Sequence, residues 1–197
     1  SATVQDALAN FKRKESDFSK LPDRIFFQLN DTHPAIAVAE LQRLLVDKEG
    51  LPFSQAWEIT RRCMGYTNHT IMPEALEKWN LDLFGKLLPR HLEIIYDINF
   101  LFLQELRDRG FHADEIARAS IIEEGHPKRI RMAALAVVGS SAVNGVSALH
   151  SELVKKNLFP EYARLWPEKF SNKTNGIAFR RWLVAANPGL TNLEYAL

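Results

Sequence analysis

A strand, a polar turn and a helix follow one another near the N-terminus of this chain. Ile25–Leu29 is a short apolar run, rich in strand-forming residues. Asp31 and Thr32 then supply the chemistry of a helix N-cap, and Pro34 suits a first helical turn. The next helix is marked by an apolar stripe and a terminal glycine: Val38, Leu41, Leu44, Leu45 and Gly50. This order is the basic unit of an α/β fold.

The rest of the chain repeats the alternation of strands and longer helices. Met64–Thr67 predicts a second short strand. Met132–Val138 fits a strand or a buried helix by periodicity, and the Gly139-Ser140-Ser141 breaker favours the strand. Helices are expected over 3–18, 54–62, from Pro89 to Gly110, 113–119, 146–156 and 179–186, with short helices and turns over 159–170. The sequence therefore predicts a helix-rich α/β fold with a largely parallel sheet.

Bulk properties exclude several classes of protein. The chain has 197 residues, enough for one domain or one large lobe, and a net charge of +1 gives no field for nucleic acid or an anionic membrane. Cys63 is the only cysteine, so no intrachain disulfide forms. No apolar stretch approaches the roughly 20 residues of a membrane span, and the N-terminus is unlike a signal peptide. We expect a cytoplasmic protein with no membrane or nucleic-acid partner.

Four polar segments contain most of the candidate functional residues. They consist of hydrogen-bonding side chains with little net charge, and at least three follow apolar sequence and precede a helical pattern. In an α/β protein that is where strand ends meet helix starts, so the segments are expected on one rim that suits a ligand rich in hydroxyl groups. The segments are Leu29–Pro34, Tyr66–Thr70, Ser140–Gly145 and Asn172–Gly176.

Each segment also has an interpretation without function. Asp31 can cap a helix, and the dipeptides Asn144-Gly145 and Asn175-Gly176 are typical of tight turns. Asn68-His69-Thr70 is one of three N-glycosylation sequons, but the single cysteine and the absent signal sequence argue against glycosylation. From the residues alone, the structural interpretation of these positions is the simpler one.

Other chemistries have little support. The six histidines form no His-Glu-x-x-His pair, and there is no cysteine cluster, so no metal is expected. Glycine-rich nucleotide loops and the Gly-x-Ser-x-Gly elbow are absent too. A metal-dependent hydrolase that uses Asp31, His33 and His69 remains one alternative. A non-catalytic module that binds a hydroxyl-rich ligand or a partner through the same rim is another.

Taken together and in this order, the segments resemble the α-glucan phosphorylase family, which includes glycogen, starch and maltodextrin phosphorylases. The similarity covers essentially the whole chain, and a string of this length is highly specific. The matching stretches are Leu29–Pro34, Tyr66–Thr70, Pro73–Trp79, Leu88–Tyr96, Val143–Val146 and Asn172–Gly176 with Arg180–Trp182.

The resemblance implies a fold and a position within it. Family members have two Rossmann-like lobes of the glycosyltransferase-B type, and this chain resembles the later part of the N-terminal lobe. We expect residues 1–197 to form a single partial domain, in which 177–197 begins the segment that leads to the C-terminal lobe. The lysine that binds pyridoxal phosphate lies in that second lobe and has no counterpart here, so the chain alone is expected to be inactive. The alternative is a non-catalytic module that binds α-glucan or a partner through the same polar segments.

The resemblance also implies a reaction and a set of roles. The family transfers glucosyl units from α-1,4-glucans to inorganic phosphate, giving glucose 1-phosphate, and its members are expected to be homodimers. Asp31 and His33 should border the sugar cleft, and the backbone carbonyl of His69 should lie near the glucosyl ring. Glu77 should lie in a side pocket. The remaining expected contacts of glucose are Asn144, Gly145, Val146 and Asn175.

Two departures from the family pattern suggest a divergent member. Ser141 stands where the family often has histidine. Ala178-Phe179 replaces the usual Thr-Pro before Arg180, and the loss of proline leaves the turn into the next helix less constrained.

Overall fold

The computed structural model describes residues 1–195 and is built on a four-stranded parallel sheet. The strands are β1 (Phe27–Asn30), β2 (Met64–Thr67), β6 (Ala142–Gly145) and β7 (Phe170–Asn172), in the order β1-β2-β6-β7. All three neighbouring pairs are parallel. The predicted helix-rich α/β fold with a parallel sheet is thus confirmed.

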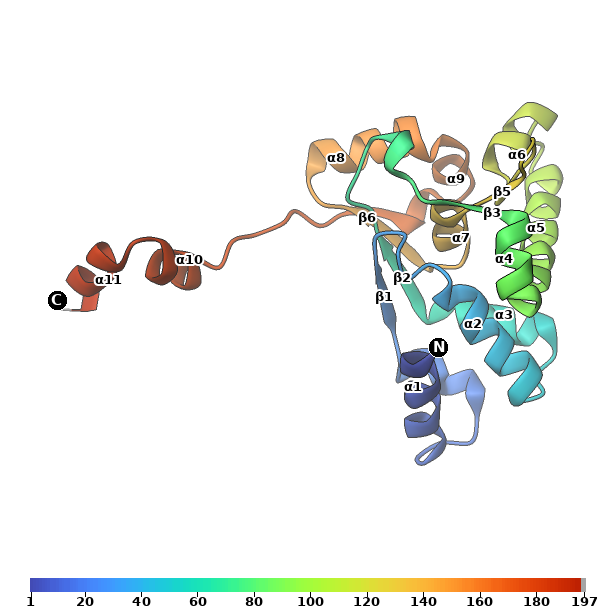
Figure 1. Ribbon diagram of the computed structural model, residues 1–197, viewed down its shortest axis with the longest axis horizontal. Coiled ribbons are helices and arrows are strands. Elements are labelled where there is room, and N and C mark those ends of the chain that lie inside the picture. Colours follow the sequence, from blue (N-terminus) through green and yellow to red (C-terminus); the bar gives the residue numbers. More distant parts are fainter. Residues whose placement is uncertain (196–197) are drawn as a thin grey trace.

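Helical crossovers join the strands, as parallel pairing requires. In Figure 1, α2 to α7 lie to one side of this sheet. The first crossover contains α2 (Ala37–Arg43), a π-helical turn (Leu44–Lys48) and α3 (Phe53–Arg62). The second contains α4 (Leu81–Leu87), α5 (Pro89–Asp108), α6 (Ala113–Ala119) and α7 (Met132–Val138). The third contains α8 (Ala148–Leu153), a π-helical turn (Val154–Leu158) and α9 (Pro160–Leu165).

A second, antiparallel sheet lies within the long middle crossover. Its strands are β3 (Lys78–Asn80), β4 (Ile122–Glu123) and β5 (Arg129–Arg131), in the order β3-β5-β4. The sequence did not predict these strands, because runs of two or three residues show no periodicity. Their role is to pin the segment that contains Glu77, since the Met132 N–H donates to the Glu77 carbonyl over 3.1 Å.

Aromatic side chains link the sheet to the helices on its covered face. Tyr66 of β2 is fully buried against Phe159, which in turn packs edge-on against Tyr162. Phe102 of α5 stacks on Tyr162 at 5.4 Å and contacts Trp166. Burying these rings stabilises the fold by about 2 kcal/mol each, and it fixes the direction in which β2 ends.

The prediction of a strand over Met132–Val138 is wrong, because this segment is the helix α7. All seven of its side chains are buried, so its pattern is uniformly apolar and carries no helical period. The breaker at Gly139 has a packing reason instead. A Cβ on Gly139 would meet Val38 of α2 at 2.4 Å, so only glycine permits this close approach. The strand that the sequence predicted here begins at Ala142, four residues after the end of α7.

Three predicted helices have different boundaries. The helix expected over 3–18 is α1 (Ala2–Lys12), and a separate 3-10 helix, Phe18–Asp23, follows once Asp17 caps it. The helix expected from 146 begins at Ala148, where the Ser147 hydroxyl accepts the His150 N–H. The helix expected directly after Asp31 begins only at Ala37, after a series of tight turns.

The C-terminal segment extends away from the rest of the structure (Figure 1). After β7, an extended stretch leads to α10 (Phe179–Ala186) and α11 (Pro188–Tyr195). The last two positions of the predicted segment 177–197, Ala196 and Leu197, lie outside the described residues. Within the described part, no helix is both long and apolar enough to cross a bilayer.

Candidate functional site

The four polar segments lie at one edge of the parallel sheet. Neighbouring strands pair Asn30 with Thr67, Thr67 with Asn144, and Gly145 with Asn172. Because the strands are parallel, their carboxyl ends meet at the same edge, which is where open α/β sheets bind ligands. We call this edge, formed by residues 30–33, 67–70, 144–146 and 172–175, the polar rim.

The first part of the polar rim is a sharp turn at Asp31. Its backbone N–H donates to the Thr67 carbonyl over 2.9 Å, and then the chain turns with φ of 62° at Asp31. Aspartate is one of the few residues that tolerate this left-handed conformation, because its carboxylate binds nearby N–H groups. Here Oδ1 accepts the N–H of Thr32. The carboxylate is therefore held at the strand end by the backbone itself.

His69 and Asn30 form the second contact across the rim. The His69 ring nitrogen Nε2 lies 2.6 Å from Oδ1 of Asn30. The segment that contains His69 is shaped by Asn68, which is fully buried. The Asn68 amide donates to the Tyr66 hydroxyl over 3.1 Å, and its oxygen accepts the Thr70 N–H over 3.1 Å. Burial raises the pKa of Tyr66, so its hydroxyl stays protonated while it accepts the hydrogen bond from Asn68 beneath the rim.

Thr67 joins the first two strands of the rim to the third. Its hydroxyl accepts the Gln28 amide at 2.9 Å and donates to Oδ1 of Asn144 at 2.9 Å. The Asn144 carbonyl accepts the N–H of Asn68 at 2.9 Å. Side chains and backbone thus tie β1, β2 and β6 at the level where the polar segments begin.

The far part of the rim is held by the backbone of residues 145 and 146. The Gly145 carbonyl accepts the Lys173 N–H over 3.1 Å, and the Val146 carbonyl accepts the Asn175 N–H over 3.0 Å. Gly145 is buried, and a Cβ at this position would meet Ser151 Oγ at 2.5 Å. Asn175 itself is exposed, so its side-chain amide faces solvent, while its backbone N–H is held by the Val146 carbonyl.

Glu77 occupies a side pocket next to the turn at Asp31. It accepts hydrogen bonds from the Thr32 hydroxyl at 3.3 Å and from the Trp79 indole at 2.8 Å. A cavity of about 660 Å³ lies beside it, and Thr32, His33, Lys78 and Arg129 are among its lining residues. Glu77 and His33 also border a smaller, mainly apolar cavity of about 170 Å³. Glu77 thus lies between a cavity with charged lining residues and a smaller, mainly apolar cavity.

The structure brings all eight residues singled out from the sequence to the rim or its side pocket. Asp31, His69, Asn144 and Asn175 belong to the rim itself. Sequence reasoning overlooked Thr67 and Asn30, whose side chains connect the rim, although both lie in or next to quoted segments. It also missed Arg129, which reaches the side pocket from the second sheet and had no signal in the sequence.

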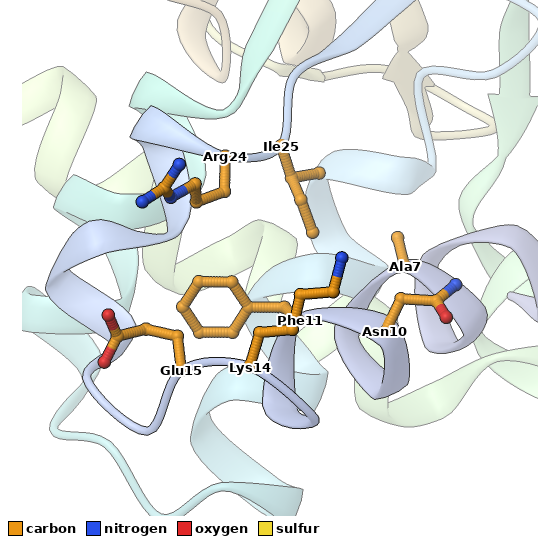
Figure 2. A pocket seen from close by; sticks show the side chains of 7 residues that line it. All are labelled: Ala7, Asn10, Phe11, Lys14, Glu15, Arg24 and Ile25. Atoms are coloured by element: carbon orange, nitrogen blue, oxygen red, sulfur yellow. The ribbon is translucent and has the colours of Figure 1, made fainter.

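A third cavity, of about 470 Å³, opens between α1 and the chain that leads into β1 (Figure 2). Its lining includes Phe11, Lys14, Glu15 and Arg24. This cavity lies beside Ile25, at the amino end of β1, whereas the polar rim lies at the carboxyl end. In addition, Glu15 already binds Lys20 at 3.0 Å. The cavity is therefore separate from the candidate site.

The described residues do not fit a pyridoxal phosphate site or a metal site. Pyridoxal phosphate needs a lysine amine for its Schiff base and donors for its phosphate. The buried lysine here is Lys169, and its amine donates to the Val137 carbonyl over 3.2 Å and lies 3.7 Å from the Trp166 ring centroid. Burial lowers its pKa to about 7, but it is enclosed by core side chains. Among residues 1–195, no group of three His, Cys, Asp or Glu side chains is arranged to hold a metal.

Comparison with known proteins identifies the family of this chain. A family model described as carbohydrate phosphorylase matches residues 1–196. The chain belongs to the carbohydrate phosphorylase family. The resemblance drawn from its motifs is thereby confirmed.

Relatives within the phosphorylase family are similar along nearly the whole chain. The glycogen phosphorylases of Chlamydia pneumoniae and Synechocystis are each 53% identical to it, over 98% of this chain and 24% and 23% of their own lengths. The liver form of human glycogen phosphorylase is 50% identical over 98% of this chain and 24% of its own length. The chain thus spans about a quarter of the length of these phosphorylases.

Proposed function

We propose that this chain forms the glucose-binding wall of an α-1,4-glucan phosphorylase, as the later part of its N-terminal lobe. The enzyme would transfer a glucosyl unit from the non-reducing end of glycogen or maltodextrin to inorganic phosphate, giving glucose 1-phosphate. The observation that supports this most is the polar rim, where mostly uncharged hydrogen-bonding groups from four strand ends lie side by side. Such groups suit the hydroxyl groups of a sugar ring.

His69 would act through its backbone. No backbone N–H of residues 1–195 donates to the His69 carbonyl, so this dipole is free to face a ligand. A carbonyl oxygen near the anomeric carbon favours the positive charge that develops there during glucosyl transfer. The contact between the His69 ring and Asn30 would hold the carbonyl in place.

Asn175 and Asn144 would bind hydroxyl groups from the far side of the rim. The Asn175 amide is exposed, but its backbone N–H is fixed to Val146. A fixed backbone lowers the entropy that the side chain loses when it binds. Asp31 would border the same cleft, and Glu77 with His33 would line the side pocket beside the anomeric position.

The remaining features of the proposed enzyme come from the family. These are inorganic phosphate as the second substrate, pyridoxal phosphate as the cofactor, a homodimer and a cytoplasmic location. Bound pyridoxal phosphate would supply a phosphate group for acid–base chemistry. Since the described residues do not fit that cofactor, this chain would provide binding and charge stabilisation, and we expect no phosphorolysis from it alone.

Binding of maltoheptaose to the 197-residue chain tests the proposal. In a ¹⁵N NMR titration we expect shifts at Asp31, His69, Asn144 and Asn175, without formation of glucose 1-phosphate when phosphate is added. Asn175→Ala should weaken binding about tenfold, the cost of one good hydrogen bond. Asn10→Ala, at the cavity of Figure 2, is the matched control and should bind normally. Shifts confined to other surfaces would contradict the proposal.

A further inference from the structure

The first turn of α8 contains a histidine that the proposed function does not use. His150 lies three residues after the N-cap Ser147, and its ring folds back over the chain that enters the helix. Its Nδ1 accepts the backbone N–H of Val146 over 3.1 Å. The imidazole thus binds the residue that ends the third segment of the polar rim.

This hydrogen bond fixes the tautomer of the neutral ring. A nitrogen that accepts an N–H carries no proton, so neutral His150 must carry its proton on Nε2. Nε2 is buried, and it has no hydrogen-bond partner among the residues that the structure describes. The ring therefore interacts with the described chain mainly through Nδ1, and its polar contact is directed at Val146.

Val146 connects His150 to the segment of the rim that contains Asn175. Its N–H is held by His150, and its carbonyl accepts the N–H of Asn175 over 3.0 Å. The two bonds leave the Val146 backbone little freedom to move. His150 and Asn175 are thus joined through one residue, although they come from different segments of the chain.

The neighbouring Ser151 strengthens the same arrangement. Its Oγ lies 3.2 Å from Oδ1 of Asn172, and it would lie 2.5 Å from a Cβ on Gly145. His150 Nδ1 would lie 2.8 Å from that same Cβ. The absence of a side chain at Gly145 therefore allows α8 to approach close enough for both contacts.

We propose that His150 is a positioning residue for the sugar site. It holds Val146, and through Val146 it sets the position of Asn175, without touching the ligand itself. The inference rests on the proposed function in one respect, namely that Asn175 binds a glucose hydroxyl. The mechanical link from His150 to Asn175 stands on the geometry alone and can be tested alone.

Two amide substitutions separate this role from simple packing. Oδ1 of asparagine is bonded to Cγ, as Nδ1 of histidine is, so His150→Asn keeps an acceptor for the Val146 N–H. In His150→Gln the amide lies one bond farther out, near the position of Nε2, and this acceptor is lost. His150→Leu removes both nitrogens and keeps much of the apolar bulk.

NMR of the 197-residue chain measures the link directly. In the wild type we expect the ¹⁵N signature of an imidazole that is protonated at Nε2 and accepts at Nδ1. In His150→Gln and His150→Leu, hydrogen exchange at the backbone N–H of Asn175 should become about tenfold faster. Each kcal/mol lost from the free energy of opening this hydrogen bond raises the exchange rate severalfold. His150→Asn should stay within about twofold of wild type on the same scale. A ring protonated at Nδ1, or unchanged Asn175 exchange in folded Gln and Leu variants, would overturn the proposal.

Maltoheptaose binding then separates the two proposals. If the wild type binds at the rim, affinity should fall about fivefold to tenfold in the Gln and Leu variants and recover in His150→Asn. Equal affinity in all variants would refute the positioning role. If the wild type shows no binding at the rim, the proposed function fails, whereas the Asn175 exchange data still decide whether His150 positions that residue.

Discussion

The Thr67 hydroxyl donates a hydrogen bond to Oδ1 of Asn144 over 2.9 Å and so joins two strand ends that lie 77 residues apart in sequence. The same oxygen accepts the Gln28 amide from the edge strand. Thr67 is only half-buried, yet its side chain touches polar groups of both neighbouring strands. The rim is therefore assembled by its own side chains as well as by the sheet.

Removal of this hydroxyl should loosen the rim. Thr67→Val has nearly the same shape but leaves Oδ1 of Asn144 without its donor. We expect the free energy of unfolding in urea to fall by about 1 kcal/mol, the usual value of such a bond. Thr67→Ser keeps the hydroxyl and should lose less than half as much. Equal losses in both variants would assign the effect to the methyl group instead.

Gly145, in the rim, and Gly176, directly after it, give a matched pair of substitutions. A Cβ at Gly145 would meet the Ser151 backbone Cα at 2.8 Å, which cannot move aside, so Gly145→Ala should destabilise the fold by about 1–3 kcal/mol. A Cβ at Gly176 meets nothing within 4 Å, so Gly176→Ala should leave stability nearly unchanged. Thermal unfolding followed by circular dichroism distinguishes the two, and similar midpoints would show that α8 is not packed this closely.

The sequence predicted the parallel sheet and its polar edge because both depend on local patterns. Ile25–Leu29 and Met64–Thr67 have the composition of strands, and the polar residues after them need only the rule that parallel strands end at one edge. Met132–Val138 could not be assigned in this way. Every side chain of this helix is buried, so its sequence shows no period, and the glycine that follows it is required by a contact with Val38, 101 positions earlier in the chain.

Parts of the site depend on contacts that no local pattern reveals. Phe170–Asn172 became a strand only because Gly145 and its neighbours offered an unpaired edge. Arg129 reaches the side pocket because β5 pairs with β3, which also contains Trp79. These features follow from tertiary structure, and the sequence alone did not indicate them.

Glu40 should make stability depend on pH in the acidic range. Burial alone would raise the pKa of this carboxyl, but hydrogen bonds from Arg43, Ser1 and His91 outweigh it and lower the pKa to about 2. A depressed pKa means that the stabilisation is complete above the unfolded value of 4.5 and is lost as the pH falls toward 2. We expect a contribution of up to about 3 kcal/mol to disappear across that window.

The variant Glu40→Gln isolates this contribution. It should be less stable than the wild type at pH 6, while the difference should shrink steadily between pH 4.5 and pH 3. Urea unfolding at each pH gives both curves. A constant difference across this range would mean that the Glu40 carboxylate is not held by the groups around it.

Lys169 should also make stability depend on pH, but in the alkaline range. Burial, followed by the charge of Arg61, lowers its pKa from 10.5 to about 7, so the folded protein binds fewer protons than the unfolded chain between these values. Stability should therefore rise with pH from 7 toward 10.5. In Lys169→Met this rise should be absent, whereas Lys173→Met, at an exposed site, should keep it. Parallel curves for wild type and Lys169→Met would show that the amine stays charged.

The turn at Asp31 allows the role of a carboxylate to be separated from the role of a backbone conformation. Asparagine also tolerates the left-handed region, so Asp31→Asn should keep the free energy of unfolding within about 0.5 kcal/mol of wild type. Alanine does not, and Asp31→Ala should lose about 1–2 kcal/mol. Both variants remove the negative charge from the rim.

If the carboxylate borders the sugar cleft as proposed, Asp31→Asn and Asp31→Ala should weaken maltoheptaose binding by similar factors despite their different stabilities. The same pair, placed at the matching position of the Synechocystis glycogen phosphorylase, should lower its phosphorolysis in parallel. Loss of binding in Asp31→Ala alone would show that the turn matters and the charge does not. In that case Asp31 holds the strand end, and the contacts with glucose belong to the asparagines and the His69 carbonyl across the rim.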